Sequence, residues 1–543
     1  MPESIAHFVR VHRRLADVRS ERAVILGIGS EATRLLCAAR DLGIQVRAFV
    51  SPNPGHWGRD FEGLPVTSLA RALRHGCNAV LVPPSVDYSH IVETLGLVGR
   101  DALDVFACEA PLDHGSFALN NRLLAAAHQH VRDALKDPAL QTVLPASRRW
   151  QEYLRRIADE LDDITTVNEA ILYAQRKIGF NHRSEVTPHI EAHCARMETR
   201  FRALFPEYAD LLAVLDESPH SDSTTLLYVD RRRRSNVFYY QAQTLLNSLT
   251  HAGRPAIVAE IGSGTGELAR LWLDNPVHRP ACVLIDWPHS LFFAEVFLRK
   301  NFPELRIRYL HHDEPLTADE VAPGEAIFCP LTRLPALRQL HLDLVINTGS
   351  MQEMTEEWVD FFMDWLSAQP CRFLYSVNYF AQPLAFMAES ANSWSPRLSP
   401  EWHAVPLRFG NDHLRPQLAL FAEKRSEPDP LSPADAARAF ADVRCTAPAP
   451  ERFFAAMDLF RRSRNADLAW GIVEWCMDDP AFRPKELWYL VEFIAGSGSR
   501  GACPRFAASY RELSDIRESS VCDTLPDLPP LARVEDPGGG LAP

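Results

Sequence analysis

The sequence predicts an α/β protein with two parallel β-sheets, because strand and helix patterns alternate in two separate stretches. In the first hundred or so residues, Ala23-Val24-Ile25-Leu26-Gly27 has the pattern of a buried strand and a helix follows through Leu42. The alternation returns at Ala256 and runs to about Lys424. Strands separated by helices imply crossover connections, and these produce parallel pairing.

Length and charge limit the classes of protein to consider. The 543 residues exceed what one hydrophobic core organises, so two to four domains are expected. With 46% hydrophobic and 23% charged residues, most of the chain should fold. The net charge of -13 argues against a nucleic-acid partner, because binding phosphates needs a basic face.

The eleven cysteines form no Cys-x-x-Cys pair and show no zinc spacing, which fits a reducing cytoplasm. The first residues lack the apolar core of a signal peptide, and no apolar run reaches the length of a membrane span. We expect a cytoplasmic protein with no membrane span and no metal. His311-His312-Asp313-Glu314 reads as an exposed loop, because neighbouring residues of an extended segment point to opposite faces.

The patterns divide the chain into five parts. Helical spacing dominates between the two alternating stretches, most clearly over 120–135, 146–175 and 188–204, and it returns after the Pro-rich segment 426–433. The expected parts are an N-terminal Rossmann-like domain (1–112), a helical connector (113–248), a second α/β domain (249–425), a helical C-terminal domain (426–520) and a disordered tail (521–543).

The N-terminal domain carries a weak nucleotide motif. Gly27-Ile28-Gly29-Ser30-Glu31-Ala32 matches Gly-x-Gly-x-x-Ala, but the second strand ends in Phe49-Val50-Ser51, without an acid for a ribose. A nucleotide site and a scaffold with a tight turn both fit. We favour the scaffold and expect no binding of NAD.

The second α/β domain carries a stronger motif. A strand over Ile257 to Ile261 runs into Glu260-x-Gly262-x-Gly264-x-Gly266, and a helix follows at once. The next strand ends at Asp286, which follows Gly266 by 20 residues. Glycines allow a sharp turn and close approach of a ligand, and an acid at the end of the second strand can bind a ribose diol.

This spacing indicates the cofactor S-adenosylmethionine and a class I (Rossmann-like) methyltransferase domain. A dinucleotide loop has the form Gly-x-Gly-x-x-Gly and directs its helix at a pyrophosphate, which S-adenosylmethionine lacks. Glu260 suits the ammonium group of the cofactor. The other predicted contacts are Gly262, Ser263, Gly264, Gly266, Asp286, Trp287 along the adenine, and Asn347.

The remaining strands place further side chains at the same edge of the sheet, where such folds bind ligands. The third strand is either Leu305 to Leu310 or Ala326 to Cys329, and the pattern does not decide between them. The fourth ends at Asn347, and the fifth precedes Asn378-Tyr379.

The stretches EIGSGTGELA, VLIDWP, LDLVINTGSMQEM and FLYSVNYF together resemble the bacterial family of sugar O-methyltransferases, over roughly 188–382. The resemblance implies as acceptor a sugar hydroxyl in a surface polysaccharide or its activated precursor. In the N-terminal domain, FEGLPVTSLARAL resembles accessory domains of sugar-modifying enzymes, including the C-terminal domain of sugar C-methyltransferases.

Position in the fold suggests the candidate catalytic and acceptor-binding residues. Glu353, after the fourth strand, is our first choice for the base that removes the hydroxyl proton, and His289 is the second. Glu353 could instead cap the following helix. Gln352, Asn378 and Tyr379 are the predicted acceptor contacts, with Arg231 and Arg233 as anchors for a phosphorylated acceptor. A solvated charged turn is the other interpretation of the arginine run.

Two other functions stay open at this point. The domain could methylate a peptide or another small metabolite, since a cofactor loop carries no information about the acceptor. It could also be a scaffold that keeps the fold without catalysis. The acceptor is expected to be a small molecule or glycan, and the amphipathic C-terminal helices leave a homo-oligomer open.

Overall fold

The structure is a computed structural model. The residues that it describes are 9–12, 22–83, 103–107, 117–141, 146–178, 186–222, 225–229, 232–379, 401–407, 417–425, 430–445 and 450–478, with isolated positions between them. The chain divides into two compact units. The first is Met1–Ser350, Asp364–Ser376 and Phe421–Lys424, and the second is Met351–Met363, Val377–Leu420 and Arg425–Pro543.

The N-terminal domain contains a seven-stranded sheet in the order β1-β7-β6-β2-β3-β5-β4. All neighbours pair in parallel except β4 and β5. The strands are β1 (Val9–His12), β2 (Ala23–Leu26), β3 (Val46–Val50), β4 (Asp60–Phe61), β5 (Leu64–Thr67), β6 (Ala79–Leu81) and β7 (Leu103–Phe106). The predicted Rossmann-like sheet is therefore present, with β1, β4 and β5 as strands that the sequence did not predict.

Helices and apolar side chains on both faces hold this sheet. Its elements between the strands include α1 (Ser30–Asp41), η2 (Pro54–His56) and α2 (Leu69–Arg74). Val24, Val50 and Leu69 belong to one buried cluster, and Ile25 and Leu36 belong to another. Alternate residues of a strand thus enter two different cores, which is expected of a sheet buried on both faces.

The connector is helical, but the helix expected over 146–175 is interrupted. Thr166 and Glu169 form a capping box that begins a new helix. The elements are α4 (Phe117–Leu135), η3 (Pro138–Gln141), α5 (Arg148–Glu160), η4 (Leu161–Asp163), α6 (Val167–Leu172), the π-helical η5 (Tyr173–Ile178), α7 (Pro188–Leu204), η6 (Pro206–Tyr208), α8 (Ala209–Val214), the hairpin β8 (Leu227–Val229) and β9 (Arg232–Arg234), and α9 (Asn236–Ala252).

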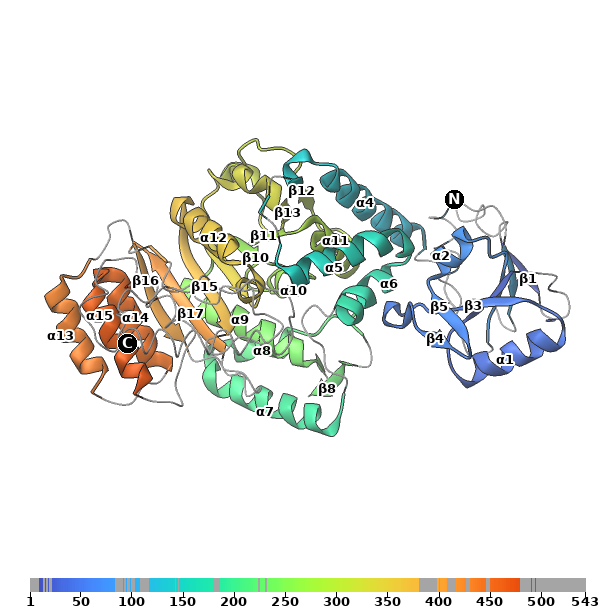
Figure 1. The fold of residues 1–543 in the computed structure, drawn as a ribbon, viewed down its shortest axis with the longest axis horizontal. Coiled ribbons are helices and arrows are strands. Elements are labelled where there is room, and N and C mark those ends of the chain that lie inside the picture. Colours follow the sequence, from blue (N-terminus) through green and yellow to red (C-terminus); the bar gives the residue numbers. More distant parts are fainter. Residues whose placement is uncertain are drawn as a thin grey trace, which may run out of the picture. The chain divides into compact units, whose positions relative to one another are not determined.

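The second sheet has eight strands in the order β12-β13-β11-β10-β14-β15-β17-β16 (Figure 1). The strands are β10 (Ile257–Ile261), β11 (Ala281–Asp286), β12 (Ile307–Tyr309), β13 (Ala326–Pro330), β14 (Leu342–Thr348), β15 (Cys371–Tyr379), β16 (Trp402–Leu407) and β17 (Gln417–Lys424). The sequence left open whether 305–310 or 326–329 is the third strand, and both segments contain strands, β12 and β13. β13 pairs with β11, and β12 adds an edge beyond it.

The strand order identifies the fold. Counted without the edge strand β12, it is 3-2-1-4-5-7-6, which is the dinucleotide-binding order 3-2-1-4-5-6 with a seventh strand placed between the fifth and the sixth. This is the sheet of a class I methyltransferase. Its other elements are α10 (Glu267–Asp274), α11 (Pro288–Asn301), η8 (Ala318–Glu320), η9 (Leu331–Leu337), η10 (Met351–Glu353) and α12 (Glu356–Ala368).

One large cluster joins the connector to this sheet domain. Phe292, Phe293, Val296 and Phe297 of α11 lie in the same buried cluster as residues of α4, α5 and α6, including Ile171. Tyr173 stacks on Phe293 with ring centroids 5.5 Å apart. The connector helices therefore cover α11, the helix that comes directly after Asp286 and Trp287.

The second unit includes three C-terminal helices, α13 (Pro433–Val443), α14 (Pro450–Ser463) and α15 (Ala466–Met477), which share one apolar cluster. Most of the helix expected over 484–494 and the whole tail 521–543 lie outside the described residues. Within the described part of the chain, no helix combines the length and apolar character needed to cross a membrane.

Candidate cofactor site

The glycine loop after β10 forms a tight turn. Gly262 N donates a hydrogen bond to Ile285 O in the neighbouring strand (2.8 Å), and Gly266 N donates to Ser263 O (2.9 Å). Gly262, Gly264 and Gly266 have φ angles of 76°, 53° and 73°. These left-handed conformations suit glycine, because a side chain there is strained. α10 then begins directly after Gly266.

Gly262 is also required by crowding. A Cβ atom at this position would overlap the Oγ and Cβ atoms of Ser350. Ser350 Oγ donates to Ile261 O (3.0 Å), and Asn347 Nδ2 donates to the same oxygen (2.9 Å) and to Ser350 Oγ. Residues at the end of the fourth strand and just after it thus hold the end of the first strand in place.

These contacts change how two residues are interpreted. Asn347 is fully buried and binds the carbonyl that precedes the loop, so its contact with the loop is to the backbone. Its direct contact with the cofactor stays a prediction. Ser350 was not singled out from the sequence as a loop contact, and only its place in the stretch Ser350 to Met354 pointed to this region.

Asp286 is tied to the glycine loop. Its Oδ2 accepts a hydrogen bond from Gly264 N (2.8 Å) and its Oδ1 accepts one from Trp287 N (2.7 Å). These two bonds orient the carboxylate at the glycine loop. Trp287 is half-buried and precedes α11.

Glu260 is a buried carboxyl group near Asp286. Burial raises the pKa of Glu260 well above its usual range, and the charge of Asp286 raises it further. Among the described residues, Glu260 has no hydrogen-bond or ion-pair partner. A buried carboxylate without a partner is costly, and a bound cation would remove that cost.

Two more polar groups near the loop lack partners within the described part of the chain. They are Ser263 Oγ and His289 Nδ1, and both side chains are buried. Burial lowers the pKa of His289 to about 4. The imidazole is therefore neutral near pH 7 and is a weak base there.

The connector also contacts the beginning of α10, which the sequence analysis did not foresee. Gln175 Nε2 in the π-helical segment donates to Glu267 Oε1 (3.3 Å), and its Oε1 accepts from Asp222 N (3.0 Å). Glu267 directly follows Gly266. A short π-helix is often found at functional sites, but its position cannot be read from hydrophobic spacing.

Gln352, Glu353 and Asn378 belong to the second unit. Gln352 N donates to Asn378 Oδ1 (3.2 Å), so the segment after β14 and the end of β15 meet, as their positions after neighbouring strands indicated. Glu353 is half-buried and ends η10. Tyr379 ends β15, and its side chain lies outside the described residues.

Arg232 to Arg234 of the arginine run form strand β9, between α8 and α9. Arg231 lies outside the described residues. Arg233 forms an ion pair with Asp216 (3.1 Å) and donates to Glu217 O (3.1 Å). Arg234 is buried and pairs with Glu198 (3.3 Å). Arg233 and Arg234 thus have partners inside the chain, and an anchor for phosphate at Arg231 and Arg233 stays a prediction.

These groups fit S-adenosylmethionine, the cofactor of the class I methyltransferase fold. A cofactor ammonium group matches the unpartnered, buried Glu260. A ribose diol matches Asp286, which the loop and Trp287 hold in position. The turn at Gly262 leaves no space for a side chain, which fits a backbone that approaches a ligand closely.

Comparisons with known proteins find distant structural likenesses and add nothing on the acceptor. No protein-family model and no curated protein matches the chain. Among solved structures, it is similar to magnesium protoporphyrin IX methyltransferase from Synechocystis with bound SAH (13% identity, 34% of this chain and 84% of that one, TM-score 0.24). Human N-acetylserotonin methyltransferase in complex with SAM is also similar (10% identity, 56% and 67%, TM-score 0.26). At these scores the likenesses carry no argument about activity.

Proposed function

We propose that this chain is an S-adenosylmethionine-dependent methyltransferase that methylates an oxygen atom, and that its acceptor is a sugar hydroxyl in a surface polysaccharide or its activated precursor. The observation that carries the cofactor assignment is the unpartnered, buried Glu260 beside a glycine loop that is itself tied to Asp286.

The chain's residues have separate tasks in this proposal. Glu260 holds the ammonium group, Asp286 the ribose, and Trp287 lies along the adenine. When bound, S-adenosylmethionine supplies a methyl group that is electrophilic because it is attached to a positively charged sulfur. Most of the protein's contribution is to hold the acceptor oxygen in line with that carbon and to keep water away.

Acceptor binding is assigned to the segment after β14 and the end of β15. The contact between Gln352 N and Asn378 Oδ1 supports this, because it fixes the Asn378 amide against the backbone of the segment that carries Gln352. Amides both donate and accept hydrogen bonds, which suits hydroxyl groups. The resemblance of the segment from Ser350 to Met354 to sugar O-methyltransferases supports a sugar over other acceptors.

Glu353 is the proposed base, and His289 is less suited to that task. With a pKa of about 4, His289 provides little driving force for accepting a hydroxyl proton. Helix α12 begins at Glu356, directly after Thr355, so Glu353 lies before the capping position of that helix. That position weakens the alternative in which Glu353 only stabilises the helix.

The first experiment is calorimetry of S-adenosylmethionine binding to the full chain, followed by transfer of a labelled methyl group to sugar nucleotides and to extracted polysaccharide. Binding with transfer to a sugar supports the proposal. Transfer only to peptides or other metabolites would contradict the sugar acceptor, and absence of cofactor binding would indicate a scaffold.

Glu353→Gln tests the base. It keeps the size and hydrogen bonding of the side chain but removes its basicity, so turnover should fall about 10²-fold with cofactor affinity unchanged. The matched control is Glu357→Gln, an exposed position on α12, which should leave turnover unaltered. Normal turnover in Glu353→Gln removes this residue as the base.

A further inference from the structure

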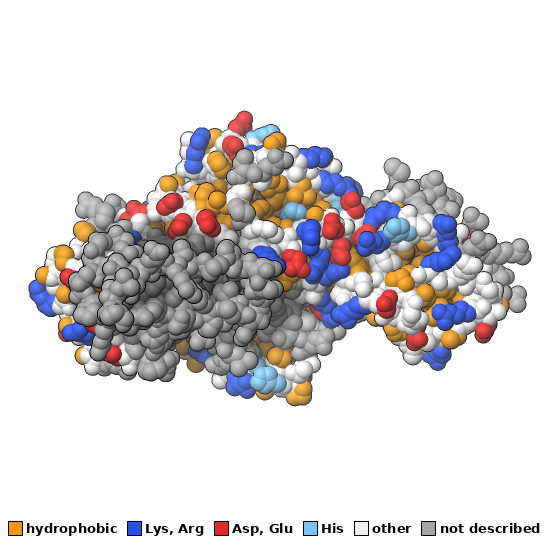
Figure 2. All heavy atoms as spheres, in the orientation of Figure 1, with side chains coloured by type: hydrophobic (Ala, Val, Ile, Leu, Met, Phe, Trp, Pro, Cys, Tyr) orange, Lys and Arg blue, Asp and Glu red, His pale blue; other side chains and the backbone are white. Residues whose placement is uncertain are grey.

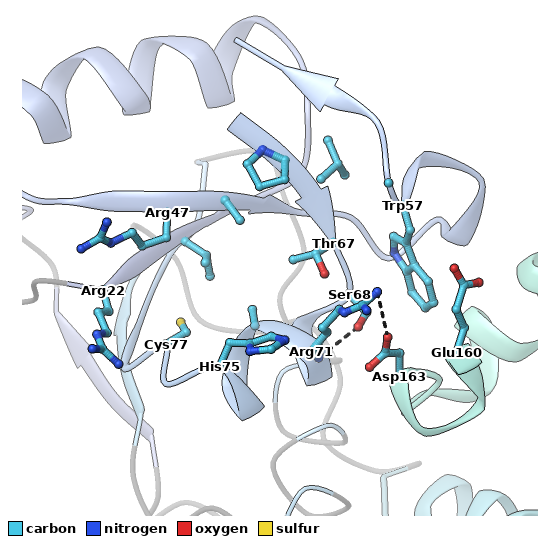
Figure 3. Close-up of a pocket in the computed structure, with 16 residues that line it drawn as sticks. Arg22, Arg47, Trp57, Thr67, Ser68, Arg71, His75, Cys77, Glu160 and Asp163 are labelled. Carbon is cyan, nitrogen blue, oxygen red and sulfur yellow. Dashed lines mark hydrogen bonds and ion pairs between the residues drawn. The ribbon is translucent and has the colours of Figure 1, made fainter. Parts of the chain in front are cut away.

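A pocket of about 620 Å³ lies between the N-terminal domain and the segment of α5 and η4 that carries Glu160 and Asp163 (Figure 3). Pockets of this size commonly hold small molecules. Its apolar floor includes Val24 and Ala48, which are paired neighbours on one face of the sheet. Helix α2 borders the pocket through Arg71 and Ala72.

The pocket does not lie at the position of a dinucleotide site. Arg22 directly precedes β2, Arg47 is the second residue of β3, and His75 and Cys77 precede β6. These are the amino ends of three adjacent parallel strands. The Gly27 to Gly29 turn lies at the carboxyl end of β2, where nucleotides bind in this class of sheet.

One end of the pocket is cationic. Figure 3 shows Arg22 and Arg47 together at that end. Arg22 lies over Gly76, since a Cβ atom at position 76 would come within 2.7 Å of its Nη1 atom. Arg47 Nη2 donates to Gln45 Oε1 (2.9 Å). On the face drawn in Figure 2, basic side chains lie among apolar ones over the N-terminal domain, although the chain as a whole carries -13.

The opposite end combines an aromatic ring with carboxylates, as Figure 3 shows for Trp57, Glu160 and Asp163. Trp57 Nε1 donates to Ser51 O (2.8 Å), which fixes the ring. Glu160 accepts hydrogen bonds from Tyr173 Oη (2.7 Å) and Lys177 Nζ (2.9 Å), one on each oxygen. A carboxylate oxygen with one donor can accept another, so Glu160 is held in place and can still bind a hydroxyl group.

We propose that this pocket binds a phosphorylated sugar or a similar small polyol phosphate. Arg22 and Arg47 would hold the phosphate, for which guanidinium groups are the best protein partners. The apolar floor and Trp57 would contact the carbon skeleton, and Glu160 and Thr67 would bind hydroxyl groups. The inference concerns a site separate from the cofactor loop and does not depend on catalysis by this chain.

Calorimetry on the full chain with glucose 1-phosphate, inorganic phosphate and free glucose tests the proposal. Glucose 1-phosphate should bind more tightly than either fragment. The double variant Arg22→Gln/Arg47→Gln should weaken its binding at least tenfold. The matched control is Arg34→Gln/Arg40→Gln, which makes the same charge change at exposed positions of α1 outside the pocket and should change nothing.

Thr67→Val provides a second test that keeps side-chain shape. It should weaken binding of glucose 1-phosphate and leave inorganic phosphate unaffected. Absence of binding by any probe, equal weakening in the control, or phosphate binding as tight as the ester would overturn the proposal. So would a parallel loss of S-adenosylmethionine affinity in the pocket variants, because the arginines would then act through the fold.

Discussion

Each of the two sheets has a glycine turn of the same kind, after β2 in the N-terminal domain and after β10 in the second domain. The two domains differ at the end of the neighbouring strand, β3 or β11. In the N-terminal domain Gly27 N donates to Val50 O (2.7 Å), and in the second domain Gly262 N donates to Ile285 O (2.8 Å). In both, the residue after the first strand bonds to the end of the second strand. A glycine turn of this kind is therefore a feature of the fold and is not by itself a ligand site.

The residue at the end of the second strand separates the two domains. Asp286 directs its carboxylate back to the glycine loop. Its counterpart Ser51 is buried and hydrogen-bonds to His56 Nδ1 (2.9 Å) and Asn53 N (3.1 Å), within its own segment. The acid marks a ligand loop more reliably than the glycines.

The largest effect should come from filling the crowded loop. Gly262→Ala should weaken S-adenosylmethionine binding about 100-fold, because it adds a side chain at a left-handed φ and displaces Ser350, each costing on the order of 1–3 kcal/mol. Calorimetry measures the affinity. Gly29→Ala, also at a positive φ but in open space, should leave cofactor affinity unchanged.

A second substitution separates crowding from backbone strain. Ser350→Gly removes the atoms that a Cβ at position 262 would meet, so Gly262→Ala/Ser350→Gly should recover part of the lost affinity. Unchanged affinity in Gly262→Ala alone would show that the contact with Ser350 does not constrain the cofactor loop.

Removing the acid should have the next largest effect. The Asp286 carboxylate accepts hydrogen bonds from two backbone N–H groups, those of Gly264 and Trp287. In Asp286→Asn, the amide NH₂ group would face one of these two donors and could not accept its hydrogen bond. We expect affinity for S-adenosylmethionine to fall roughly tenfold to a hundredfold, which corresponds to about 1.5–3 kcal/mol for charge-assisted hydrogen bonds. Ser51→Ala, the equivalent change in the N-terminal domain, should not alter it. Equal affinities of Asp286→Asn and the unaltered protein would disprove this role.

Much of this site could be predicted because its residues are close in sequence or lie at strand ends. Glu260, the three glycines and Asp286 are fixed by local spacing and by a strand-helix-strand unit. The contact of Ser350 with the loop could not be predicted, since it depends on how a distant segment packs. The interruption of the connector helix had a local signal, Thr166-x-x-Glu169, which the helical spacing around it obscured.

Edge strands were the other difficulty. β1 and β12 are short, at three or four residues, and contain Arg10, His12 and Arg308 among their apolar residues. An edge strand is partly exposed and needs less apolar sequence than a central strand. The central strands β10 and β11 are buried at every position and were predicted without difficulty.

Cofactor affinity should depend on pH through Glu260. In the free protein, its raised pKa makes the folded state bind more protons than the unfolded state, so the stability it contributes is greatest below about pH 4.5 and is lost as pH rises. A bound ammonium group favours the ionised form. Affinity should therefore rise with pH, by up to about tenfold per unit below the raised pKa, with release of a proton on binding.

Calorimetry in buffers of different ionisation enthalpy measures the number of protons released when S-adenosylmethionine binds. Glu260→Gln should abolish both the proton release and the pH dependence of affinity. Proton uptake on binding, or the same pH dependence in Glu260→Gln, would show that Glu260 is not the partner of the ammonium group.

The smallest effect is expected at the N-terminal glycine turn, where NADH and NADPH should not bind at micromolar concentrations. Their ribose needs an acceptor after the second strand, and the hydroxyl of Ser51 is occupied by His56 and Asn53 while Ser51 O accepts from Trp57 Nε1. Titration followed by nicotinamide fluorescence measures this directly, with Gly29→Val as the matched variant. Micromolar binding that Gly29→Val removes would mean that a glycine turn alone is enough for a nucleotide here. In that case the presence of an acid at position 286 and of a serine at position 51 would not explain why one glycine turn is a ligand site and the other a scaffold.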